Sequence, residues 1–138
     1  MRVDWAILSR YAEGSAGVAT IVGAGIDTFY SVTFPVPIQA ALTVQLRGQP
    51  DELGETHEIS LRILDANLEL VGDPATISFE AEPNPDLEDG WEAGVLVAVN
   101  NQFVAETAGT YSIEIDVDGK HAKSVPFRIL EQPEETAI

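Results

Sequence analysis

TYSIEIDVD, residues 110–118, places a polar residue at every even position and an apolar residue at every odd position. Successive side chains of an extended strand point to opposite faces of a sheet, so this pattern predicts a half-buried β-strand. A helix would distribute the same apolar residues around its circumference. The alternation recurs in five further segments, at residues 42–47, 59–63, 77–82, 91–99 and 125–129.

Segments rich in Gly, Pro, Asn and Asp separate these runs, at residues 13–17, 48–54, 65–67 and 82–90. Such residues tolerate or preset turn dihedrals, so we expect eight or nine strands and no long helix. The sequence therefore predicts an all-β protein, built as a two-sheet antiparallel β-sandwich. A chain of 138 residues fits one domain, at residues 1–130, followed by an acidic tail at residues 131–138.

One hairpin can be predicted in detail, because Asp118-Gly119 is a favoured pair for a two-residue turn. That turn places Val117 opposite Lys120, Asp116 opposite His121, and Glu114 opposite Lys123. The apolar side of the second strand is then out of phase by one residue. A β-bulge near Lys123-Ser124 restores the phase, and a three-residue loop is the alternative.

Prolines and glycines indicate where the sheets end. Pro126 has no N–H to donate, so the C-terminal strand is expected at a sheet edge, or Pro126 at a bulge. The segment 34–37, with two prolines, predicts a crossing between sheets. Gly23 and Gly25 predict a bulge or kink in a long strand; a dinucleotide site would need a third glycine and a following helix.

The charge balance is strongly acidic, with 23 Asp and Glu against 7 Lys and Arg, a formal net charge of −16. Such a surface repels phosphate backbones and anionic lipids, so nucleic acid and membranes are not expected as partners. The chain has no cysteine, which excludes disulfides and thiolate chemistry. Without a signal-like N-terminus or a long apolar run, the expected location is the cytoplasm.

Two features near residue 90 are candidates for binding. The loop with Glu82, Asp86, Glu88 and Asp89 gathers carboxylates of the kind that bind calcium, although a solvated acidic loop explains the same residues. Trp91, at the end of this loop, is a candidate binding anchor. The other candidate calcium motif, at residues 116–119, lacks its later ligands.

Catalytic motifs are missing from the sequence. His57 and His121 are the only histidines, and each is expected to be exposed beside a strand or turn. No Gly-x-Ser-x-Gly motif occurs, so we expect neither an enzyme nor a cofactor. Four aromatic residues are expected in the core, and for one of them, Tyr111, the alternative is that its hydroxyl pins a strand corner. They are Trp5, Phe79, Tyr111 and Phe127.

Two resemblances add to this interpretation. Residues 108–115, 118–120 and 125–129 resemble the last strands of bacterial immunoglobulin-like domains, which implies an immunoglobulin-like sandwich. Residues 2–8 and 19–27 resemble a family of small uncharacterised bacterial proteins, largely actinobacterial, which implies no known activity. The cysteine pair of antibody domains is missing.

The expected function is a non-catalytic interaction or structural module that binds a protein partner or itself, because sandwich edges and end loops are natural docking surfaces. The alternatives are a subunit of a larger particle, such as a virion decoration or coat protein, and a module that binds calcium or carbohydrate.

Overall fold

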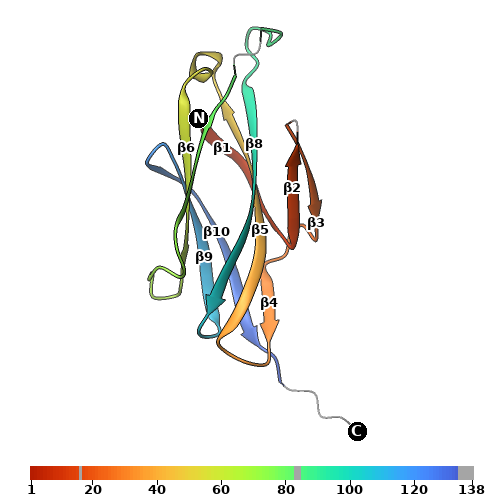
Figure 1. The fold of residues 1–138 in the computed structure, drawn as a ribbon, viewed down its shortest axis with the longest axis vertical. Helices are drawn as coiled ribbons and strands as arrows, with labels where there is room; N and C mark the ends of the chain where they lie inside the picture. The colour runs from red at the N-terminus through yellow and green to blue at the C-terminus, as the bar shows by residue number, and fades with distance from the viewer. Residues whose placement is uncertain (16, 83–84, 134–138) are drawn as a thin grey trace.

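The computed structural model describes residues 1–15, 17–82 and 85–133, and nearly all of them lie in strands or turns (Figure 1). The elements are β1 (Arg2–Ser9), β2 (Tyr11–Ser15), β3 (Val18–Val22), β4 (Thr28–Ser31), β5 (Val36–Gly48), the 3-10 turn η1 (Pro50–Glu52), β6 (Thr56–Leu64), β7 (Ala75–Glu80), β8 (Ala93–Ala105), β9 (Gly109–Val117) and β10 (Lys120–Glu131). The all-β prediction is confirmed. Residues 134–138 of the expected tail lie outside the described residues.

The described residues form ten strands, where eight or nine were expected for the chain. The chain divides near Arg10 into β1 and β2. It divides again at Gly23 and Gly25, between β3 and β4, where positive φ angles of 70° and 87° turn the chain. These glycines therefore end a strand, where a bulge or kink inside one long strand was expected.

The strands form three sheets. One has the order β1-β5-β8, the second has the order β4-β10-β9-β6-β7, and β2 and β3 form a separate hairpin. Within the described part of the chain, the strand pairs are antiparallel except β4–β10, where residues 28–31 run parallel to residues 128–131. The expectation of purely antiparallel sheets is thus wrong at this pair, because β4 enters the second sheet from the distant N-terminal part of the chain.

The two larger sheets share one hydrophobic core, and the alternation selects its residues. The core includes five residues that are at most 1% exposed. They are Leu42, Val44 and Leu46 of β5 and Ile113 and Ile115 of β9. Phe127 of β10 lies in the same core, where the centroid of its ring is 5.9 Å from the ring centroid of Phe103 in β8.

The hairpin β2–β3 covers part of the outer face of the first sheet. Ala12 is 1% exposed, and its backbone exchanges hydrogen bonds with the Asn100 side chain. Trp5, expected in the core, lies on this outer side and is only half-buried. A register shift between Val3 and Trp5 places Trp5 opposite Gln45 and so reverses its direction.

The β9–β10 hairpin confirms the predicted turn and one of the two expected ways to restore the phase. Asp118 and Gly119 have φ angles of 51° and 80°, as a tight two-residue turn requires. The pairs Val117–Lys120 and Asp116–His121 form as expected, and a bulge follows. It lies at Ala122, slightly earlier than predicted, so Glu114 pairs with Ser124 and the expected Glu114–Lys123 pair is wrong.

Pro126 shows why the edge prediction holds only in part. The Arg128 N–H donates to Asp27 on the β4 side, so the nitrogen of Pro126, two residues earlier, points to the same side. No described strand pairs there, since β4 pairs with β10 only from Arg128 onward. β10 is therefore an edge strand at Pro126 and has neighbours on both sides at residues 128–129, where the pairings with β4 and β9 overlap. The chain crosses from β4 in the second sheet to β5 in the first between residues 31 and 36, so the crossing predicted at residues 34–37 is confirmed.

Tyr111 packs in the core with its ring and forms a hydrogen bond at a strand corner with its hydroxyl. It is 4% exposed, its ring stacks on Phe127 at 5.6 Å, and its hydroxyl donates to the Thr107 carbonyl at 2.5 Å. Tyr111 therefore fulfils both predictions, a core ring and a hydroxyl bonded at the strand corner, because the ring and the hydroxyl have separate partners.

Tyr111→Phe is expected to lower the free energy of unfolding by about 1 kcal/mol, because the ring still packs while the Thr107 carbonyl loses its donor. Urea unfolding measures the change. Tyr30→Phe is the matched control, since Tyr30 is 62% exposed. Equal midpoints for both variants would show that the corner hydrogen bond contributes nothing.

Candidate functional site

The acidic loop between β7 and β8 does not assemble a metal site among the described residues. The side chains of Glu82, Asp86, Glu88 and Asp89 are all exposed. In the described ranges, no group of three or more His, Asp or Glu side chains is arranged to hold a metal ion. Pro83 and Asn84 lie outside the described residues, and calcium binding stays an untested prediction.

Trp91 lies at the end of this loop, as expected. Its side chain is 64% exposed, and its backbone N–H donates to the Glu88 carbonyl at 3.0 Å. A large exposed aromatic residue can serve as a binding anchor, but no second aromatic residue with comparable exposure adjoins it in sequence.

His57 is buried, so the expectation that it is exposed is wrong. Only 4% of the residue is exposed, although it lies at the start of β6. Its Nδ1 lies 2.7 Å from an Asp118 carboxylate oxygen and its Nε2 lies 2.9 Å from the Glu52 carbonyl oxygen. Both partners are acceptors, so both contacts are satisfied only when both ring nitrogens carry hydrogen, which favours the cationic imidazole.

Hydrogen bonds and charges around His57 shift the pKa values of His57, Asp118 and Glu52. The pKa of His57 is raised, first by its hydrogen bond to the Glu52 carbonyl and then by Asp118. Burial alone would raise the pKa of Asp118, but the bonds from His57 and from the Glu58 N–H lower it. The pKa of the Glu52 carboxyl is lowered by the Met1 amino group and by the Gln49 N–H.

This cluster joins both sheets at one end of the molecule. Met1 precedes β1 and Glu52 ends η1 after β5, whereas His57 is the second residue of β6 and Asp118 lies in the β9–β10 turn. Because both nitrogens of His57 already have partners, its ring is not free to exchange protons with a substrate. The cluster is suited to holding the two sheets together.

A second polar cluster contains a serine, a histidine and a glutamate on the outer side of β9 and β10. Nε2 of His121 lies 2.6 Å from a Glu114 carboxylate oxygen and 3.1 Å from Oγ of Ser124. Ser124 itself donates to the same carboxylate oxygen. A catalytic triad needs one ring nitrogen for the serine and the other for the acid, so this arrangement lacks the relay geometry.

Among the described strands, the longest one without a charged residue is β8. Its thirteen residues, AGVLVAVNNQFVA (93–105), contain no Asp, Glu, Lys, Arg or Pro, although 22% of the chain is charged. β8 pairs with β5 along its full length, and no other described strand pairs with its second edge. Natural edge strands are normally protected by charges, prolines or bulges, so this edge is unusual.

The backbone direction of β8 follows from Pro37, which pairs with Val104. Proline has no N–H, and the continuous pairing therefore requires the Pro37 nitrogen to face away from β8. The Leu8 carbonyl agrees, because it accepts from Gly25 and so points away from its β5 partner, Leu42. Along an antiparallel ladder, pairs whose backbone groups face each other alternate with pairs whose backbone groups face away. Pro37–Val104 is a pair of the second kind. The N–H and C=O groups of the even-numbered β8 residues therefore point to the free edge.

The inner side chains next to this edge are incompletely covered. Val95, Val97 and Val99 are half-buried, whereas Val44 and Leu46 of the neighbouring β5 are fully buried. The free edge therefore leaves both backbone groups and apolar side chains in contact with solvent.

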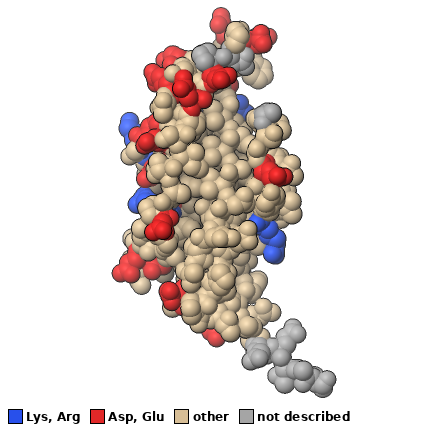
Figure 2. Space-filling view, in the orientation of Figure 1, with Lys and Arg blue, Asp and Glu red and all other residues tan. Residues whose placement is uncertain are grey.

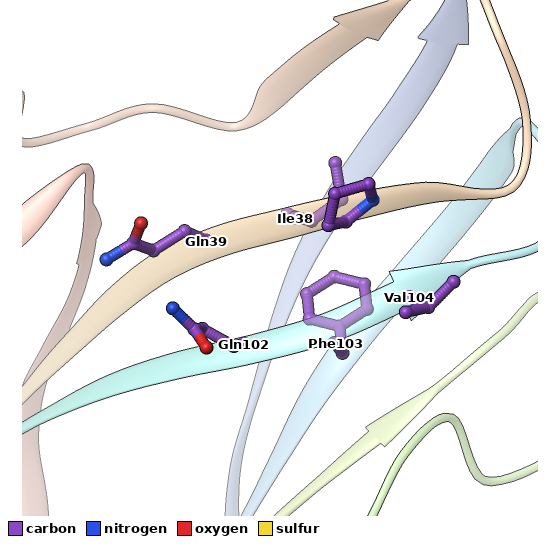
Figure 3. Close-up of a pocket in the computed structure, with 6 residues that line it drawn as sticks. Ile38, Gln39, Gln102, Phe103 and Val104 are labelled. Atoms are coloured by element: carbon purple, nitrogen blue, oxygen red, sulfur yellow. The ribbon is translucent and has the colours of Figure 1, made fainter.

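The surface around β8 and β5 carries few charges in the viewed face of the molecule. Figure 2 shows acidic side chains gathered at the end that holds the β7–β8 loop, and an uncharged area over the middle of this face. Near the other end of β8 lies a hollow of about 400 Å³, lined by Pro37, Ile38, Gln39, Gln102, Phe103 and Val104. Gln39 and Gln102 pair across the two strands, with their amides side by side (Figure 3).

Sequence reasoning identified β8 as a strand but missed its free edge. The run of thirteen residues without charge or proline favours an interior strand, because edge strands are normally protected by such residues, so the sequence pointed away from a free edge. The burial of His57 had no local signal, since its partners are 5 and 61 residues away.

Comparison with known proteins gives a family and no activity. No helical segment in the described parts of the chain has the length and apolar character needed to cross a membrane. A search of the curated proteins found no match. Residues 4–130 match DUF6941, a family of unknown function, and this chain therefore belongs to the DUF6941 family.

Proposed function

We propose that this protein is a non-catalytic interaction module that binds an extended strand of a protein partner along the free edge of β8. The single observation that carries the proposal is the unpaired edge of thirteen uncharged residues in a chain of net charge −16. Strand addition supplies affinity through main-chain hydrogen bonds, and the side chains that alternate above and below supply specificity.

Three features of β8 support this mode of binding. The even-numbered residues offer a repeating series of free N–H and C=O groups, as an incoming strand requires. The half-buried valines offer apolar area that a partner strand covers. The outward side chains of Asn100 and Gln102 are uncharged, so they add no desolvation cost of an ion.

The proposal includes a finer description of the fold and location. The orders β1-β5-β8 and β10-β9-β6-β7 correspond to the A-B-E and G-F-C-C′ strands of an immunoglobulin-like sandwich, and the Tyr111 corner supports this assignment. We infer that the family is bacterial, and that the protein works in the cytoplasm, which fractionation of native cells tests.

A single proline tests the binding mode. Gln102→Pro removes an N–H that faces the free edge and leaves the ladder to β5 intact, because prolines are tolerated on the open side of an edge strand. Gln102→Ala, the matched control, removes the side chain and keeps the N–H. In affinity capture from native cells with mass spectrometry, we expect a protein retained by wild type and by Gln102→Ala to be lost with Gln102→Pro.

Two outcomes contradict the proposal. In the first, wild type and Gln102→Pro retain the same proteins. In the second, both substitutions reduce capture equally, which shows that side-chain contact, rather than the strand edge, mediates binding. Circular dichroism of each variant confirms that the β-fold is kept before capture is compared.

A further inference from the structure

We infer that the partner strand at the β8 edge is β8 of a second copy of this chain, so that two protomers join their sheets antiparallel across a two-fold axis. This inference rests on the proposed function, because it names the occupant of the same edge. The joined sheet has the order β1-β5-β8-β8-β5-β1.

Charge is the first argument for a second copy. Two chains of net charge −16 repel each other wherever their acidic surfaces meet. β8 carries no charged residue between Ala93 and Ala105, so its edge is a region where two copies can approach without placing like charges opposite each other. A strongly basic partner would gain no ion pair from β8 itself.

Self-complementarity is the second argument. A two-fold axis brings the same surface of each copy together, so every group offered by one copy must find its complement on the same strand of the other. In antiparallel pairing, the outward-facing N–H and C=O groups of even-numbered residues meet those of even-numbered residues. That register keeps Val95, Val97 and Val99 of both strands on the core side and the amides of Asn100 and Gln102 on the outer side.

The inner side chains give the third argument. Val95, Val97 and Val99 are β-branched residues that sit half-covered at the sheet edge. An antiparallel neighbour with the same residues places a second row of valines beside them and removes apolar surface from water on both copies. The β6–β7 loop approaches β8 near Phe103, where a Cβ on Gly72 would lie 3.6 Å from Cβ of Phe103. We therefore place the pairing over residues 94–102.

The test is the mass of the protein in solution, measured by sedimentation equilibrium over a range of concentrations. We expect wild type to sediment at twice its monomer mass of 14.8 kDa. Ala98→Pro removes an edge-facing N–H near the middle of the pairing on each copy, and its ring clashes with the incoming strand. We expect its dimer dissociation constant to rise at least about tenfold, since two hydrogen bonds are lost per dimer.

Ala98→Ser is the matched control, because it changes the side chain and keeps the N–H. It is expected to remain a dimer. If the circular dichroism spectrum of Ala98→Pro shows that this variant does not fold, Gln102→Pro replaces it in the same comparison, because Gln102 is exposed. A dimer that persists in the folded proline variant overturns the inference, and so does a wild type that stays monomeric at every concentration.

A wild type that stays monomeric overturns the self-pairing of β8 without by itself overturning the proposed function. A monomeric wild type whose captured protein is lost with Gln102→Pro shows that β8 binds a different chain, so only the identity of the partner is wrong. A monomer whose captured proteins do not respond to Gln102→Pro overturns both.

Discussion

Leu42→Ala is expected to lower the free energy of unfolding by about 2–5 kcal/mol. Leu42 is fully buried in the middle of β5, the central strand of its sheet. Its side chain belongs to the core shared by both sheets, so its removal leaves a cavity that strands paired on both sides cannot readily close. Chemical denaturation at one fixed protein concentration measures the change.

Leu68→Ala is the control for this experiment, because it makes the same chemical change at a side chain that is 75% exposed. We expect it to change stability by less than about 0.5 kcal/mol. A loss below about 1 kcal/mol for Leu42→Ala would mean that the two sheets do not pack on this residue as described.

His57→Phe is expected to destabilise the protein by about 1.5–3 kcal/mol at pH 6, the range for hydrogen bonds to a charged group. The phenyl ring fits the place beside Phe79 but leaves the Glu52 carbonyl without its donor. The Asp118 side chain is 41% exposed, so water screens that ion pair and the bond to Glu52 carries most of the effect.

The pH dependence of this difference has a definite sign. The folded-state pKa of His57 is raised above its ordinary value, so the stability it contributes is fully present below about pH 6.5 and is lost as pH rises through the folded-state pKa. The lowered pKa values of Glu52 and Asp118 act in the opposite direction, since their contributions are lost as pH falls through their folded-state pKa values. Measurements therefore begin at about pH 5.

Denaturant unfolding of wild type and His57→Phe from pH 5 to pH 10 tests this account. The difference between the two proteins should shrink as pH rises. The control is His121→Phe, because the His121 side chain is 54% exposed and its carboxylate contact lies at the surface. A difference that stays constant or grows with pH would mean that His57 is not a cation in the folded protein.

Local patterns in the sequence predicted what depends on local geometry. Alternation identified β9, because each side chain there faces the side that the period of an extended strand dictates. The turn at Asp118-Gly119 and the need for a bulge followed from the same reasoning, since a phase error within one hairpin is visible in the sequence.

Features that depend on distant residues were missed. The parallel pairing of β4 with β10 joins residues about 100 positions apart, and no short pattern encodes it. The bulge that turns Trp5 outward depends on its pairing with β5. His57 was expected to be exposed because it lies at the beginning of a strand, while Asp118, which pairs with it, lies 61 residues further along the chain.

Amide hydrogen exchange, resolved by residue, reports whether the free edge of β8 pairs with another strand. In concentrated wild type, we expect slow exchange at the odd-numbered amides, bonded to β5, and at the even-numbered amides from Leu96 to Gln102. In Ala98→Pro, only the even-numbered amides should become fast. Even-numbered amides that already exchange rapidly in concentrated wild type would contradict the account, because the edge would then be open to water.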